Sequence, residues 1–275
     1  MPAVARLSIA PVRSLGLEHP AEIDVTERGV VEDRRFFLAD DSNRLIDRII
    51  IGRLVQISAH TDPAATMLRM TFPDGQVIED DVHLGEPIET PIHGRTGVGH
   101  VVDGPWAAAL STFTGRSVRL IRCDRPGGTR IGNPTSLISD GSLRRLTDQF
   151  GLDALDSRRF RMLVELTGAT AHEEDTWIGG RIAVGDTILR VTKPVARCAI
   201  TTQDPDTGAR DLDTLRTIID YRGLRDGKHA DFGILAEVEQ PGRIRLGDEV
   251  VVLDVPAASD GAVRPPATPA VRSMR

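Results

Sequence analysis

Cysteine is scarce in this chain. Only Cys123 and Cys198 occur among its 275 residues. Two cysteines are too few for the disulfide framework of a small secreted domain or for a four-cysteine zinc site. The first residues, MPAVARLSIAPVRSLG, lack the apolar core of a secretion signal, and no segment approaches the roughly 18 apolar residues of a membrane-spanning helix. We therefore predict a cytoplasmic protein with reduced thiols.

An excess of positive charge is also lacking. The net charge is −6 at pH 7, so the chain as a whole is a poor electrostatic match for nucleic acid or an anionic membrane, although a local basic pocket is compatible with it. The seven histidines show no H-x-x-x-H or H-E-x-x-H spacing, which argues against a histidine-based zinc site. The glycine-rich run 127–132 lacks the Gly-Lys-Ser/Thr ending of a P-loop, and we interpret it as a flexible loop at the rim of the active site.

Short apolar segments separated by Gly, Pro and Asp predict an antiparallel sheet or barrel in the N-terminal third, and strands return in the second half. The predicted strands are Val4–Ala10, Arg35–Ala39, Leu54–Ser58, Met67–Phe72, Val98–Val102, Val118–Ile121, Met162–Leu166, Arg181–Val184, Thr187–Val191, Ile234–Val238 and Glu249–Leu253. Helices are predicted where an apolar pattern follows a residue that favours a first helical turn, such as Pro105, or ends at a glycine, such as Gly115. The predicted helices span residues 106–113, 141–150 and 213–221.

The most informative segment surrounds Cys198. An apolar strand ends at Pro194 and a turn-rich segment begins at Asp204, so Cys198 is predicted near a strand end, where a side chain can face a cleft. Arg197 is its neighbour, and positive charge favours the thiolate, the form that binds metals and attacks electrophiles. A soft thiolate suits a sulfur-rich metal centre.

Two other interpretations of Cys198 remain open at this point. A free cysteine is often a small buried apolar residue, and that interpretation is kept for Cys123. A nucleophilic pair of Cys198 with a histidine such as His172 is a further alternative, although nothing in the spacing favours it.

The run RCxxTTxDPDTG, residues 197–208, resembles the signature of the MOSC family, in particular the branch that contains the mitochondrial amidoxime-reducing component and its bacterial relatives. Other segments match family motifs in the same order along roughly residues 1–254. These segments are Pro11–Ser14, Asp33-Arg34, Ser139–Leu143, Arg159–Arg161, Glu174–Trp177 and Gly242–Asp248.

The resemblance implies a mostly β, α+β fold. We expect an N-terminal β-barrel-like module at residues 1–104, a MOSC β-barrel domain with a few helices at residues 105–254, and a disordered tail at residues 255–275, which is rich in Ala and Pro. A cofactor site is expected in a cleft between the two modules.

The resemblance also implies that Cys198 is the protein ligand to molybdenum in a pyranopterin cofactor. The phosphate and polar ring edge of such a cofactor need cationic and hydroxyl donors, and arginine can bind a phosphate in bidentate fashion. The candidate cofactor-binding residues are Arg13, Ser14, Arg34, Ser142, Arg161, Arg197, Thr201 and Thr202.

Asp204 is a candidate catalytic residue beside Cys198. Thr201, Thr202 and Asp204 could orient the thiolate or the other ligands of the metal. The alternative is that residues 204–208 form only a turn, which also explains Pro205 and Gly208. One departure from the family is Leu163, which stands where the family has an asparagine near the cofactor.

By resemblance, the chain is expected to be a molybdenum-dependent oxidoreductase that reduces N-hydroxylated compounds such as amidoximes and hydroxylamines. No cysteine cluster for an iron–sulfur centre is present, so the electrons must come from a separate flavoprotein, ferredoxin or cytochrome b5-like partner. Two rival functions stay open: a carrier or sulfur-transfer protein for the molybdenum cofactor that uses Cys198, and a β-barrel binding module without redox chemistry.

Overall fold

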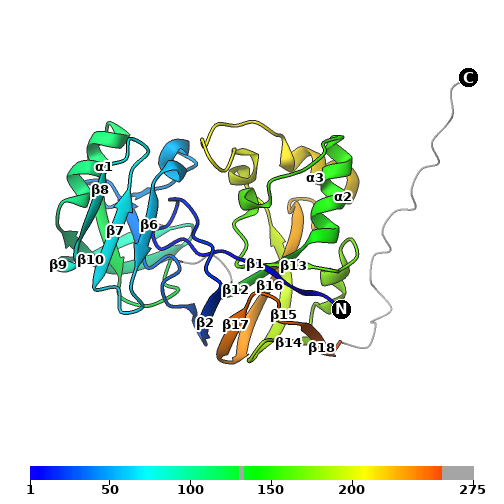
Figure 1. Cartoon of the computed structure of the whole chain (residues 1–275). Helices are drawn as coiled ribbons and strands as arrows, with labels where there is room; N and C mark the ends of the chain where they lie inside the picture. Colours follow the sequence, from blue (N-terminus) through cyan, green and yellow to red (C-terminus); the bar gives the residue numbers. More distant parts are fainter. Residues whose placement is uncertain (130–132, 256–275) are drawn as a thin grey trace, which may run out of the picture.

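The chain forms two β-rich lobes that lie side by side (Figure 1). A computed structural model describes residues 1–129 and 133–255. Strands predominate in both lobes, and the largest sheet curls into a half barrel. The predicted fold class, mostly β with a few helices, is confirmed.

The first lobe is built on a seven-stranded sheet. Its order is β1 (Ala3–Leu7), β13 (Val164–Thr167), β12 (Thr135–Ser139), β16 (Asp231–Gln240), β15 (Thr187–Ala196), β14 (Arg181–Val184) and β18 (Val250–Asp254). Only the pair β12–β13 is parallel. A three-stranded sheet of β17 (Gly242–Arg245), β2 (Glu22–Thr26) and β3 (Gly29–Val30) packs with it.

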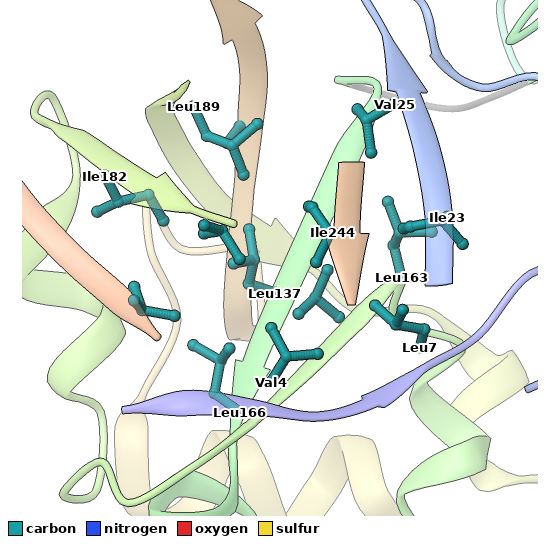
Figure 2. Close-up of a cluster of buried hydrophobic side chains, with 14 of the residues drawn as sticks. Val4, Leu7, Ile23, Val25, Leu137, Leu163, Leu166, Ile182, Leu189 and Ile244 are labelled. Atoms are coloured by element: carbon teal, nitrogen blue, oxygen red, sulfur yellow. The ribbon is translucent and has the colours of Figure 1, made fainter. Parts of the chain in front are cut away.

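The core of this lobe combines side chains from both ends of the chain. One cluster joins Val4 and Leu7 of β1 and Ile23 of β2 with Leu137 of β12 and Leu166 of β13 (Figure 2). All five side chains are buried. The first 30 residues therefore complete the apolar core of a sheet whose other strands begin more than 100 residues later.

The second lobe contains two smaller sheets. One has the order β5 (Leu45–Ile46), β4 (Phe36–Ala39), β11 (Arg119–Cys123), β10 (Arg95–Asp103) and β9 (His83–Ile92), and the other has β6 (Ser58–Thr61), β7 (Met67–Thr71) and β8 (Val77–Asp81). Trp106 and Leu110 of α1 (Trp106–Thr114) pack on Phe36, Leu38 and Leu120.

The three predicted helices are present. They are α1, α2 (Asp140–Phe150) and α3 (Thr214–Arg222). Gly115 and Gly151 close the first two at φ of 68° and 65°, a conformation that glycine adopts without steric cost. The side chain of Ser139 caps α2 by accepting a hydrogen bond from the Ser142 amide. Among the described residues, none of the helices is long and apolar enough to cross a membrane.

The strand predictions fail where burial does not follow a simple alternation. The predicted strand Leu54–Ser58 is wrong, because the 3-10 helix η1 (Gly52–Gln56) buries the adjacent residues Leu54 and Val55. Strands β8 and β9 were not predicted, since most of their side chains are exposed. The strand predicted over Val4–Ala10 ends at Leu7.

Strand pairing crosses the predicted module boundary at residue 104 in both directions. β1 and β2, which precede residue 104, pair with β13 and β17, which follow it. β11 follows residue 104 and pairs with β4 and β10, which precede it. The division into modules 1–104 and 105–254 stays a prediction. The predicted disordered tail, apart from Val255, lies outside the described residues.

The variant Leu7→Ala should lower the free energy of unfolding by about 2–5 kcal/mol, because Leu7 is fully buried in the core of the seven-stranded sheet. Urea denaturation followed by circular dichroism measures this change. The matched control is Ala5→Ser in the same strand, whose side chain is exposed. Equal stability of the two variants would contradict the role of β1 in this core.

Candidate functional site

A cavity of about 220 Å³ lies where segments of both lobes meet. Its lining includes Arg13, Ser14, Arg34, Arg48, Asn133, Arg159, Phe160, Arg161, Met162, Arg197, Cys198 and Thr201. Six of these twelve residues are arginines, so a chain of net charge −6 concentrates positive charge at this point. The local basic pocket that the overall charge permits is therefore present.

Cys198 reaches the cavity from the end of the long strand β15, which stops at Ala196. The residue precedes the 3-10 helix η4 (Ala199–Thr202), and its side chain is exposed. The Thr201 amide and hydroxyl both donate to the carbonyl of Cys198, at 3.2 and 3.1 Å. Thr201 Oγ1 also lies 2.7 Å from the hydroxyl of Thr214, the first residue of α3. Main-chain and threonine contacts hold Cys198 in place and leave its sulfur accessible.

Arg197 lines the cavity, and its guanidinium is held by main-chain carbonyls. Its Nε donates to the carbonyl of Phe232 at 2.7 Å and its Nη1 to that of Phe160 at 3.1 Å. The guanidinium also lies 5.2 Å from the centroid of the Phe160 ring. Burial lowers the pKa of Arg197 to about 9. These contacts join the strand that precedes Cys198 to β16 and to η2 (Ser157–Phe160).

The N-terminal segment supplies Arg13, Ser14 and Arg34. Arg13 is buried, and its Nη1 donates to the carbonyl of Thr129 at 2.6 Å. Burial, together with the charge of Arg34, lowers the pKa of Arg13 to about 10. Arg34 forms an ion pair with Asp33, whose side chain is fully buried.

Three cavity residues have a left-handed backbone. Ser14, Arg34 and Arg161 have φ of 75°, 55° and 51°, and they are three of eight non-glycine residues with positive φ in the described chain. This conformation is uncommon for such residues and costs of order 1 kcal/mol or more each. The presence of three such residues in one cavity indicates that the surrounding structure holds these side chains in position.

Arg48 is a cavity residue that the sequence analysis missed. It is 1% exposed, its Nε donates to Gln203 Oε1 at 2.8 Å, and Gln203 Nε2 donates back to the Arg48 carbonyl at 2.7 Å. Burial, with the nearby charge of Arg159, lowers the pKa of Arg48 to about 10. The available signal was the adjacent pair Asp47-Arg48 in the otherwise apolar run Leu45–Ile51, since charged residues in such a run need partners.

Arg159 and Arg161 come from the end of η2. Arg159 is buried and binds the carboxylate of Asp211 through both Nη atoms, at 3.1 and 3.0 Å. It also donates to the carbonyl of Thr201 at 3.1 Å, and so supports the Cys198 loop. Arg161 donates from Nη2 to the carbonyl of Leu15 at 2.8 Å, and burial holds its pKa far below the usual range.

Several buried guanidinium nitrogens in the cavity wall lack a hydrogen-bond partner among the described residues. They are Arg13 Nε, Arg48 Nη1, Arg48 Nη2, Arg159 Nε and Arg161 Nη1. A buried donor without a partner costs about 1–3 kcal/mol, and more when it is charged. The residues therefore fit an anionic group that accepts hydrogen bonds inside this cavity.

The sequence profile of the MOSC domain matches residues 81–251, more than half of the chain. The chain belongs to the MOSC domain family. Among curated relatives, mitochondrial amidoxime-reducing component 1 of Mus musculus is 26% identical over 282 residues, which cover 91% of this chain and 82% of the relative. Mitochondrial amidoxime reducing component 2 of Macaca fascicularis is 34% identical, covering 90% and 82%. Molybdenum cofactor sulfurase of Caenorhabditis briggsae is 26% identical, covering 81% of this chain and 32% of the relative.

The resemblance read from the sequence motifs is thus confirmed at the level of the family. In this MOSC protein, seven of the ten predicted site residues line the cavity. They are Arg13, Ser14, Arg34, Arg161, Arg197, Cys198 and Thr201. Asn133 also lines it and donates to Thr192 Oγ1 at 2.5 Å, whereas Leu163, at the position of the family's asparagine, is buried in the apolar core. An amide is therefore present in the cavity wall, from another segment of the chain.

The structure does not bring the other three predicted residues to the cavity wall. Ser142 donates to the buried carboxylate of Glu174 at 2.7 Å, beneath α2. Thr202 donates to the carbonyl of Ala199 within η4. Asp204 accepts hydrogen bonds from the amide and hydroxyl of Thr207, at 2.7 and 2.8 Å, and these bonds lower its pKa.

His172, the histidine considered as a partner for Cys198, lies in a network outside the cavity lining. Its Nε2 is 3.3 Å from the hydroxyl of Tyr221, and it also contacts Arg222 and Ser142. Burial, together with the charges of Arg222 and Arg145, lowers the pKa of His172 to about 3. His172 is therefore neutral at pH 7 and connects α2 to α3. The run 130–132 in the predicted rim loop lies outside the described residues.

The lowered pKa of His172 predicts an acid-dependent loss of stability. The unfolded chain binds a proton at His172 near pH 6.5, but the folded chain does so only near pH 3, so this contribution to stability is complete above pH 6.5 and decreases as the pH falls. In His172→Gln, the free energy of unfolding should depend less steeply on pH between 4 and 6, by up to about 1.4 kcal/mol per pH unit. Urea denaturation at several pH values measures this slope. The exposed His83→Gln is the control, and an unchanged slope in His172→Gln would contradict the assignment.

Proposed function

We propose that this MOSC protein is a molybdenum-cofactor-dependent oxidoreductase that reduces N-hydroxylated compounds, with the thiolate of Cys198 as the protein ligand to the metal. The observation that carries the proposal is the accessible thiol in a cavity whose wall presents unpaired, buried guanidinium groups. A thiolate suits a soft, sulfur-rich metal centre, and guanidinium groups suit a phosphate. Relatives that are named amidoxime-reducing components support the same activity.

Arg13, Ser14, Arg34 and Arg161 are the residues that would bind the phosphate and the polar edge of the pterin, and Cys198 would bind the metal. When bound, the cofactor supplies a two-electron centre at which an N–OH group accepts two electrons and two protons, giving N–H and water. The protein would position the cofactor and substrate, supply positive charge and exclude water from the reacting atoms.

Individual side chains have separate tasks in this proposal. Thr201, supported by Thr214, orients the loop of Cys198. Phe160, Met162 and Leu235 form the apolar part of the wall and exclude water from the reacting atoms. Thr202 and Asp204 remain proposed as supporting residues of the Cys198 loop, and Ser142 as a more remote supporting residue in the first turn of α2.

Electrons would arrive from a separate donor protein, such as a flavoprotein, a ferredoxin or a cytochrome b5-like protein. A carrier or sulfur-transfer function for the molybdenum cofactor is the second candidate, favoured by the similarity to a molybdenum cofactor sulfurase. In that function the same thiol would hold a sulfur or deliver the cofactor without turnover.

Molybdenum content tests the role of Cys198. Wild-type protein made in a host that synthesises the cofactor should contain about one molybdenum per chain by mass spectrometry. Cys198→Ala should lose most of the metal and all activity, because the direct protein–metal bond is gone, and keep part of the pterin through the arginines. Cys123→Ala is the matched control, since this buried cysteine lies outside the cavity lining, and it should keep its metal. Wild-type metal content and activity in Cys198→Ala would contradict the proposal.

Turnover separates the enzyme from the carrier. Metal-loaded wild type should reduce benzamidoxime to benzamidine with reduced methyl viologen as electron donor, and chromatography of the product measures the rate. Multiple turnovers per chain are expected. A fully metal-loaded sample that forms no benzamidine would favour the carrier function instead.

A further inference from the structure

A second cavity, of about 340 Å³, adjoins the Cys198 cavity. Arg48 and Arg161 line both cavities. Cys198, Arg13 and Arg34 line only the first cavity. The two shared arginines therefore stand in the wall between a space that contains the thiol and a space that does not.

The shared wall carries unsatisfied positive charge. Arg48 is 1% exposed, and its Nη1 and Nη2 atoms have no hydrogen-bond partner in the described part of the chain. The same holds for Nη1 of Arg161. Neither arginine is in salt-bridge contact with a carboxylate of the described residues, although the charges of Asp204 and Asp33 act on Arg48 and Arg161 from farther away. A buried cation without a close counter-charge is costly, so this wall is suited to an oxyanion.

Gln203 holds Arg48 in the orientation that leaves these two nitrogens available. The amide of Gln203 accepts from Arg48 Nε at 2.8 Å and donates to the Arg48 carbonyl at 2.7 Å. These two contacts use Nε of the Arg48 guanidinium and the main-chain carbonyl of Arg48. The terminal edge of the planar fork, which is the edge that binds a carboxylate or phosphate in bidentate fashion, stays free.

The other charged residues of the second cavity are paired with one another. Arg158 and Asp206 both line it and form an ion pair at 2.8 Å, and Asp156 binds the same arginine at 2.6 Å. His19 also lines the cavity, and Leu17, Val55 and Pro73 supply apolar surface. A cationic wall together with apolar surface matches a small organic acid, with its oxyanion at Arg48 and its carbon skeleton against the apolar residues.

We propose that the second cavity binds an oxyanion, a carboxylate or phosphate group, of the substrate, and that Arg48 is the residue that binds it, while Arg161 in the same wall stays with the cofactor. This inference rests on the proposed function, since the reacting N–OH group would have to reach the neighbouring Cys198 cavity. It narrows the substrate class to N-hydroxylated compounds that also carry an acidic group. Arg48 is a binding residue in this proposal, and Gln203 is a positioning residue.

The test compares two compounds that differ in one acidic group, benzamidoxime and 4-carboxybenzamidoxime. For the metal-loaded wild type, steady-state kinetics with reduced methyl viologen should give a KM for 4-carboxybenzamidoxime at least tenfold lower than the KM for benzamidoxime. Arg48→Met, compared with the wild type at equal molybdenum content, should reduce the preference for the carboxylate compound, given by the ratio of the two KM values, at least tenfold. A general loss of activity would leave this ratio unchanged. Arg53→Met is the matched control, because it removes the same charge from an exposed residue that lines neither cavity.

A binding measurement that needs no turnover accompanies the kinetics. Calorimetry on the metal-loaded wild type should detect 4-carboxybenzamidine at least tenfold more tightly than benzamidine, and salt should weaken only the former. Arg48→Lys keeps the charge without the planar fork and should retain part of this preference. The wild-type preference and its salt dependence remain decisive if Arg48→Met does not fold by circular dichroism.

The other outcomes distinguish failure of this inference from failure of the proposed function. Loss of pterin and molybdenum from Arg48→Met would assign Arg48 to the phosphate of the cofactor instead of the substrate. Equal effects of Arg48→Met on both compounds, or a wild type without preference for the acid, would exclude a substrate oxyanion site. Binding of 4-carboxybenzamidine that depends on Arg48, in a protein that reduces neither compound, would refute the proposed function and leave the anion site standing.

Discussion

Burial of guanidinium groups where the two lobes meet is the constraint on which the site depends. A cation taken out of water costs several kcal/mol unless a counter-charge or hydrogen-bond acceptors replace the solvent. Asp211 offsets Arg159, Asp33 offsets Arg34, and main-chain carbonyls surround Arg197. Arg13, Arg48 and Arg161 keep guanidinium nitrogens without a hydrogen-bond partner among the described residues, and in the proposed function bound anions would supply the missing acceptors.

The two lobes approach each other closely at Gly52 and Gly208. A Cβ atom on Gly52 would lie 2.2 Å from the carbonyl oxygen of Gly208, and one on Gly208 would lie 2.0 Å from the carbonyl oxygen of Gly52. Only glycine allows the η1 segment and the 204–208 turn to meet so closely. The same approach brings Arg48 within reach of Gln203, so the turn in the family motif serves to join the lobes.

Cys198 owes its availability to the contacts of its neighbours. Arg197 and Arg159 hold the two sides of its loop, and Thr201 connects the loop to the first residue of α3. Because these contacts use the main chain and adjacent side chains, the sulfur itself need not form a structural bond. A rigid loop with a free thiol is the arrangement that a protein ligand to a metal requires.

The sequence alone determined the β-rich class, the three helices and the place of Cys198 near a strand end that faces a cavity, because each depends on local signals: Gly115 and Gly151 as caps, alternation in strands such as β14, and an apolar strand followed by a turn-rich segment. Only the tertiary structure decided that β1 and β2 pair with β13 and β17, more than 100 residues later. It also decided that η1 is not a strand, that Ser142 binds Glu174, and that Arg48 is a cavity residue. The physical reason is that strand partners, burial and unpaired donors are properties of residues far apart in the chain, which local patterns do not specify.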